Sequence, residues 1–68
     1  MTTKDTEHLH KVLSRRFAEL IDNPGEETAN ALFDTAAAID STAFWVDRKL
    51  SGRAESMMWT AIRLGANR

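Results

Sequence analysis

Two histidines, His8 and His10, are the side chains in this sequence that could most readily hold a metal ion. They stand two positions apart in a segment whose apolar spacing predicts a helix, so their rings point to different faces. A chelating pair on a helix needs a spacing of four. We therefore expect surface histidines, with no metal and no cofactor.

Carboxylates and hydroxyls do not combine into a catalytic set either. Asp34, Asp40 and Asp47 recur at intervals of six and seven along one predicted helix, where solvation or ion pairing is commoner than acid–base work. The serines have no base arranged beside them, and the three glycines are isolated, so no phosphate-binding loop forms. The sequence predicts a protein that is not an enzyme.

Basic side chains gather in two places, and each place is open to two interpretations. One set lies on a face of the first predicted helix: His8, Lys11, Arg15 and Arg16. The other lies near a predicted turn: Arg48, Lys49 and Arg53. The first set could contact phosphates or be a solvated charged face. The second could grip an acidic partner or nucleic acid, or complement a helix C-terminus. The formal net charge of −1, from nine basic and ten acidic residues, disfavours nucleic acid.

The tryptophans favour a binding role. Trp45 and Trp59 both fall off the centre of the apolar stripe of their helices, and Trp59 follows Met57 and Met58. Trp is enriched in interface hot spots and Met at adaptable binding surfaces, although two adjacent methionines also suit an ordinary core. We predict a partner-binding set of five residues: Trp45, Arg48, Lys49, Arg53 and Trp59.

Length and composition limit the class of protein. The chain has 68 residues and no cysteine, so we expect one domain, 1–68, without disulfides or thiolate metal ligands. Such a domain buries only about 60% of its surface and commonly gains stability from a partner subunit.

Its first ten residues lack the apolar run of a signal peptide, and no stretch approaches the roughly 18 apolar residues of a membrane span. We expect a cytoplasmic protein, away from membranes, with residues 1–4 and 66–68 frayed.

The apolar spacing predicts three helices, at about 6–22, 24–50 and 52–65, and hence an all-α fold. Asn23-Pro24-Gly25 ends the first helix and starts the second. Ser51-Gly52 is the second predicted break, since glycine suits a C-terminal cap. A single bent rod through Gly52 is the alternative, because glycine costs only about 1 kcal/mol inside a helix. Connections this short make the helices antiparallel neighbours.

The long second helix carries a heptad pattern of small and large apolar residues. They recur at spacings of three and four: Ala29, Leu32, Ala36, Ile39, Ala43 and Val46. Alanine at every seventh position lets two helix axes come close. The flanking helices are shorter, which leaves about 15 Å of this helix uncovered. We therefore expect a helical-bundle homodimer with this seam as its interface.

Phe44, Trp45 and Val46 stand side by side in STAFWVDRK, residues 41–49, inside this predicted helix. Consecutive helical residues point about 100° apart, so one neighbour cannot cover all three. We assign Val46 to the dimer seam and Phe44 to a second apolar stripe. Trp45 is then left at the back of the helix for a target protein.

The segment ALFDTAAAIDSTAFWVDRKLSGRAESMMWTAIRLG, residues 31–65, resembles short helical-hairpin proteins of pseudomonads and their phages. The likeness covers about half of the chain and consists of an Ala/Leu-rich helix, a short Gly-containing turn and a helix reading W-x-A-I-x-L. Some phage proteins of this kind bind and disable host regulators, and one kind is an anti-activator of quorum sensing. The resemblance implies a bacterial or phage origin and a protein-binding role, and it assigns no residue a function.

The leading hypothesis is a small homodimer that acts as a regulator or inhibitor by sequestering another protein, such as a host transcriptional regulator. The alternative is a small DNA-binding transcriptional regulator, because three helices invite a helix-turn-helix interpretation. The third helix would then present Glu55, Ser56, Thr60 and Arg63, with Trp59 among them. A basic face and steeply salt-dependent DNA binding would favour that alternative.

Overall fold

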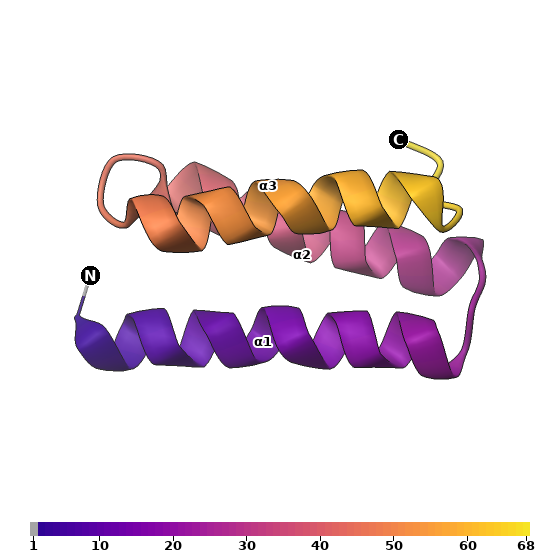
Figure 1. Ribbon diagram of the computed structural model, residues 1–68, viewed down its shortest axis with the longest axis horizontal. Helices are drawn as coiled ribbons and strands as arrows, with labels where there is room; N and C mark the ends of the chain where they lie inside the picture. The colour runs from indigo at the N-terminus through magenta and orange to yellow at the C-terminus, as the bar shows by residue number, and fades with distance from the viewer. Residues whose placement is uncertain (1) are drawn as a thin grey trace.

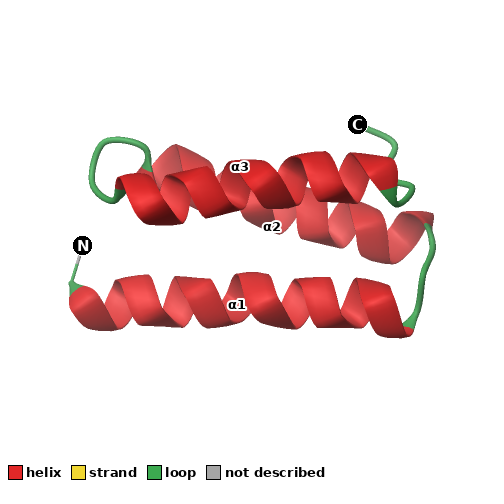
Figure 2. Ribbon diagram, viewed as in Figure 1, coloured by secondary structure: helices red, strands yellow, loops and turns green. Residues whose placement is uncertain are grey.

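The computed structural model describes residues 2–68, which form three helices joined by short turns: α1 (Thr3–Asp22), α2 (Glu26–Ala43) and α3 (Arg48–Arg63). α2 runs antiparallel to α1, and α3 runs antiparallel to α2, so α1 and α3 point the same way (Figure 1). The rest of the described chain is turn and terminus (Figure 2). The predicted all-α class and antiparallel packing are confirmed. Within residues 2–68 no helix combines the length and apolar character needed to cross a bilayer.

α1 begins three residues earlier than predicted because Thr2 caps it. The hydroxyl oxygen of Thr2 accepts a hydrogen bond from the backbone N–H of Asp5, at 3.2 Å, and the Asp5 carboxylate accepts one from the N–H of Thr2, at 3.1 Å. This reciprocal capping box satisfies two backbone donors that the helix itself leaves free. Thr2 thus caps the helix, and Thr3 and Lys4 belong to its first turn; Met1 lies outside the described residues.

The predicted break at Ser51-Gly52 is wrong. α2 ends at Ala43, residues 44–47 form the turn, and α3 continues through Gly52. The predicted ranges 24–50 and 52–65, and the single bent rod, are therefore replaced by a hairpin that turns earlier. Asp47 sets this boundary, because its carboxylate accepts a hydrogen bond from the backbone N–H of Leu50 at 3.1 Å. Aspartate caps a helix as well as serine does, and here that signal outweighs the glycine.

The heptad seam of α2 packs inside the chain itself. Five of the six predicted interface residues are at most 5% exposed: Ala29, Leu32, Ala36, Ile39 and Ala43. They form two connected core clusters with residues of the other two helices: Leu13, Leu20, Leu50, Ala54 and Ala61. Val46 lies in the turn and is 59% exposed. The seam is therefore occupied by α1 and α3, and a second copy could reach it only by opening the fold.

Glycine ends α3. Gly65 has a φ of 121°, a left-handed conformation that other residues adopt only with strain. The backbone N–H of Ala66 donates to the carbonyl of Ala61 at 2.8 Å, and the N–H of Gly65 donates to that of Ile62 at 3.3 Å. This pair of bonds is a Schellman motif, and it turns Ala66 back onto the core.

The C-terminal residues are fastened to α2 rather than frayed. The backbone N–H of Asn67 donates to the side-chain oxygen of Asn30 at 2.8 Å. The guanidinium of Arg68 forms two bonds to the carboxylate of Asp34, at 2.8 and 3.0 Å. This contact lowers the pKa of Asp34, because Arg68 stabilises the charged carboxylate. The tail thus joins the end of α3 to the first half of α2.

Gly52 provides a test of the continuous α3. It lies on the exposed side of the helix, and a Cβ added there would meet no atom within 4 Å. Because glycine inside a helix costs about 0.5–1 kcal/mol relative to alanine, Gly52→Ala should raise the free energy of unfolding by that amount. Urea melts of dilute protein, followed by circular dichroism, measure it. Gly65→Ala is the control and should destabilise; a destabilising Gly52→Ala would contradict the α3 boundary.

Candidate protein-binding surface

The turn between α2 and α3 presents three large apolar side chains, Phe44, Trp45 and Val46, which we call the aromatic tip. Their side chains are 41%, 86% and 59% exposed, respectively. Because the three residues form a turn rather than helix, they do not each need a neighbouring helix to cover them. Figure 1 places this turn at the end of the molecule where the chain begins. The tip is therefore a surface feature of one end of the bundle.

The aromatic tip is supported by contacts within the turn and with α2 and α3. The rings of Phe44 and Trp45 stack edge to face, with centroids 4.7 Å apart and planes at 89°. The guanidinium carbon of Arg48 lies 5.3 Å from the centroid of the Phe44 ring, in a cation–π contact. The backbone N–H groups of Phe44 and Val46 donate to carbonyls of α2, each at 2.9 Å. An exposed tryptophan on such a support loses little freedom on binding.

An apolar groove continues from the tip along the interface of α2 and α3. Its lining residues all lie in these two helices or in the turn: Phe33, Asp40, Phe44, Glu55, Met58, Trp59 and Ile62. Trp59 is 61% exposed and Ile62 is 38% exposed. Phe44 belongs to both the groove and the tip, so the two form one apolar surface. The carboxylate of Asp40 accepts a hydrogen bond from the buried hydroxyl of Ser51, which joins the walls of the groove.

The five predicted partner-binding residues do not share one environment. Trp45 and Trp59 are largely exposed, while Arg48 is exposed and supports Phe44. Lys49 is exposed at the start of α3. Arg53 is half-buried and faces α1. Candidates for contact with a partner are therefore the two tryptophans, Arg48 and Lys49, whereas the guanidinium of Arg53 is already engaged with α1.

Arg53 joins α3 to α1. One of its terminal nitrogens donates to the backbone carbonyl of His10 at 3.0 Å and lies 2.9 Å from the Nδ1 of the same residue. The other donates to the hydroxyl of Ser14 at 2.6 Å. These bonds fix the register of α1 against the hairpin of α2 and α3. Sequence reasoning missed this contact because the partners are about 40 positions apart in the chain.

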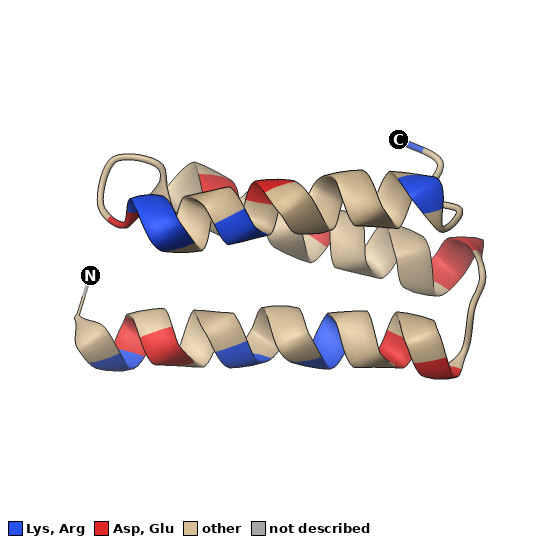
Figure 3. Ribbon diagram, in the orientation of Figure 1, with Lys and Arg blue, Asp and Glu red and all other residues tan. Residues whose placement is uncertain are grey.

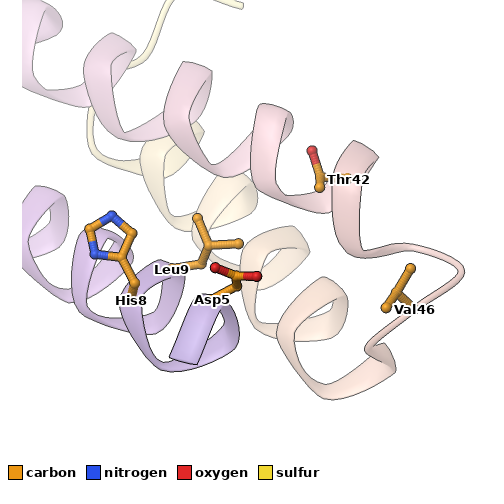
Figure 4. A pocket seen from close by; sticks show the side chains of 5 residues that line it. All are labelled: Asp5, His8, Leu9, Thr42 and Val46. Atoms are coloured by element: carbon orange, nitrogen blue, oxygen red, sulfur yellow. The ribbon is translucent and has the colours of Figure 1, made fainter. Parts of the chain in front are cut away.

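A second hollow lies between the start of α1 and the end of α2. It is lined by residues from three parts of the chain: Asp5, His8, Leu9, Thr42 and Val46. Figure 4 shows the first three on α1, facing Thr42 and Val46. Two of its polar side chains already serve the helices, because Asp5 closes the capping box and the hydroxyl of Thr42 donates to the carbonyl of Ala38 at 3.0 Å. The third, His8, is exposed. This hollow therefore has less to offer a ligand than the apolar surface.

Charges are spread over all three helices rather than concentrated. In Figure 3 the basic and acidic segments are interspersed along the bundle. Within the predicted basic face of α1, Arg16 is paired with Glu19 at 3.1 Å. Across residues 2–68 no three histidine, aspartate or glutamate side chains gather as a metal site requires. The apolar surface is thus the feature of this molecule that stands out.

Comparisons of the chain with known protein families, with characterised proteins and with solved structures give no match. The resemblance to helical-hairpin proteins of pseudomonads and phages therefore stays a prediction from the sequence pattern. The function is argued below from the geometry of the surface.

Lowering the pH tests the helix cap formed by Asp47, which positions the aromatic tip. The backbone N–H of Leu50 donates to the Asp47 carboxylate and lowers the pKa of that group. The Asp47 carboxyl group therefore takes up its proton at a higher pH in the unfolded chain than in the folded chain. The cap contributes fully to the free energy of unfolding above about pH 4, and this contribution is lost as pH falls through the folded pKa.

The matched variant is Asp47→Asn, because asparagine caps a helix about as well as aspartate but does not titrate. At neutral pH the melting temperature should stay close to that of the unmodified protein. On acidification the variant should lose less stability. Thermal melts across the acid range measure the difference, and equal losses would show that the charge of Asp47 contributes nothing to the cap.

Removal of the Arg53 contacts should loosen α1. Arg53→Met keeps the apolar stem of the side chain but deletes its hydrogen bonds to His10 and Ser14, so we expect the free energy of unfolding to fall by about 1–3 kcal/mol. Lys49→Met is the control, because the Lys49 side chain is exposed and forms no hydrogen bond to another side chain or to the backbone within residues 2–68. Its effect on the free energy of unfolding should stay within about 0.5 kcal/mol. Equal losses in the two variants would mean that the contact contributes no stability.

Proposed function

We propose that this protein acts by binding another protein through the aromatic tip, as a regulator or inhibitor that occupies a surface of its target. The observation that carries the proposal is Trp45, which is 86% exposed and yet stacked on Phe44. An exposed apolar ring gains free energy when another surface covers it, and an apolar patch rimmed by polar residues marks a protein-interaction site. The aromatic tip supplies such a ring at the most accessible point of the bundle.

The surroundings of Trp45 suit a binding hot spot. Hot spots place an aromatic anchor at the centre and polar residues around it, which exclude water once the partner is bound. Arg48 and Lys49 are exposed at the start of α3, immediately after the tip, and provide that polar rim. Because both are cationic, the target surface that fits best is an apolar pocket with acidic groups at its edge.

The DNA-binding alternative has less support. A helix-turn-helix motif crosses its two helices at about 90–120°, whereas α2 and α3 lie side by side and antiparallel (Figure 1). The exposed side of α3 carries Glu55 and Trp59 where a recognition helix presents polar and basic groups. The resemblance noted in the sequence also favours a protein target over DNA.

The test compares target binding by the unmodified protein and by variants that differ from it at a single apolar side chain. Trp45→Ala should leave the melting temperature nearly unchanged, within about 0.5 kcal/mol of unfolding free energy, because the ring is exposed. It should weaken target binding by about 2 kcal/mol, roughly thirtyfold. Immobilised protein is incubated with lysate of the source organism, and the retained proteins are titrated against each bait.

Ile21→Ala is the matched control, since Ile21 is 56% exposed on α1, away from the aromatic tip. It should retain the same target as the unmodified bait. If Trp45→Ala retains that target equally well, then the tip is not the binding site. A strong loss of stability in Trp45→Ala would instead show that the ring serves the fold.

A further inference from the structure

The outer face of α3 is a second surface without a neighbour in the chain. From Gly52 onward it consists of five exposed residues: Gly52, Glu55, Ser56, Trp59 and Arg63; the exposed Arg48 lies on the same side at the start of the helix. At about 100° per residue they fall within roughly one quarter to one third of the helix circumference, on the side opposite the buried Leu50, Ala54 and Ala61. Trp59, near the middle of this arc, is 61% exposed. The outer face therefore combines one large apolar ring with two very small residues.

The small side chains of Gly52 and Ser56 leave space over which a tryptophan ring can pack. Gly52, Glu55, Ser56 and Trp59 have the spacing i, i+3, i+4 and i+7, which on one helix frames a hole for a side chain from a facing helix. A glycine and a serine on one side of that hole leave more room than usual, and nothing lies within 4 Å of the position where a Cβ of Gly52 would be. The same face thus presents both a large side chain and a stretch of small side chains over which such a ring can pack.

The order of charges along the outer face indicates which partner fits it. Glu55 precedes Trp59 by four residues, and Arg63 follows it by four. When two copies of α3 pack antiparallel about a two-fold axis between Ser56 and Trp59, each Trp59 lies over the partner's Gly52 and Ser56. Each Glu55 then lies about 4.5 Å along the helix axis from the level of the partner's Arg63, within reach of that side chain. A parallel arrangement instead brings like charges together. Within residues 2–68 neither Glu55 nor Arg63 has an ion-pair partner. The face is therefore complementary in charge to itself.

We propose that this face binds a second copy of the chain. In this dimer each Trp59 packs over Gly52 and Ser56 of the other copy, and two reciprocal pairs join Glu55 to Arg63. The interface lies on α3 rather than on the α2 seam, which the chain has already buried. Trp45 lies outside the outer face, so this inference does not depend on the proposed function.

Charge reversal provides the decisive experiment. The mass in solution, measured by light scattering at micromolar concentration, should be twice the chain mass of 7.6 kDa. Glu55→Arg and Arg63→Glu should each weaken dimerisation by at least about tenfold, because each creates two like-charge contacts. An equimolar mixture of these two variants should form a heterodimer of restored affinity, since every cross-pair is then opposite in charge. A general effect on folding would not produce that rescue.

Two further variants test the packing of Trp59. Gly52→Leu fills the hole and should yield a folded monomer, with helicity at least equal to that of the unmodified protein. Trp45→Ala is the matched control and should remain dimeric, even where it loses a target protein. A monomeric unmodified protein, a mixture without rescue, or a dimeric Gly52→Leu would each overturn the proposal.

Discussion

The close approach that three alanines permit along α2 is the constraint on which the rest of this structure depends. Ala29, Ala36 and Ala43 are fully buried and recur once every two helical turns. Without side chains of any length, they let α1 and α3 pack directly against the backbone of α2. A domain of 68 residues has little apolar surface to bury, so this economy of space gives it a continuous core.

Use of the α2 seam for the internal core determines where binding can take place. The buried stripe leaves α2 little free apolar surface except along the groove, where Phe33 faces Ile62 and Trp59 across the interface of α2 and α3. The large apolar side chains that find no place inside lie mainly in the turn and along or at the end of α3, apart from Ile21 on α1. The two proposed contacts, with a target at Trp45 and with a second copy at Trp59, therefore use separate parts of one hairpin.

Periodicity predicted the helices but not where the longest run divides. The three-helix count, the end of α1 and the glycine at the end of α3 follow from signals that lie within a few residues of each boundary. The break after Ala43 was missed because the heptad pattern continues through Val46, while Asp47, a strong cap, was interpreted only as one of three spaced carboxylates.

The same pattern cannot tell an internal core from a dimer interface, because a seam of small residues is equally suited to a helix of its own chain and to one of another. The exposure of Trp45 could be anticipated from the crowding of Phe44 and Val46 around it. The Phe44–Arg48 contact crosses the turn between α2 and α3, so the helical spacing of four could not predict it. The Arg53 contact with α1 needed three-dimensional information.

The position of both tryptophans outside the core has an optical consequence. The chain contains two tryptophans and no tyrosine, so its intrinsic fluorescence comes almost entirely from Trp45 and Trp59. Both indoles already meet water in the folded state, at 86% and 61% exposure. Unfolding will therefore change the emission spectrum little, whereas covering either ring will shift it to the blue. The protein thus carries a natural reporter that is nearly silent for folding and sensitive to association.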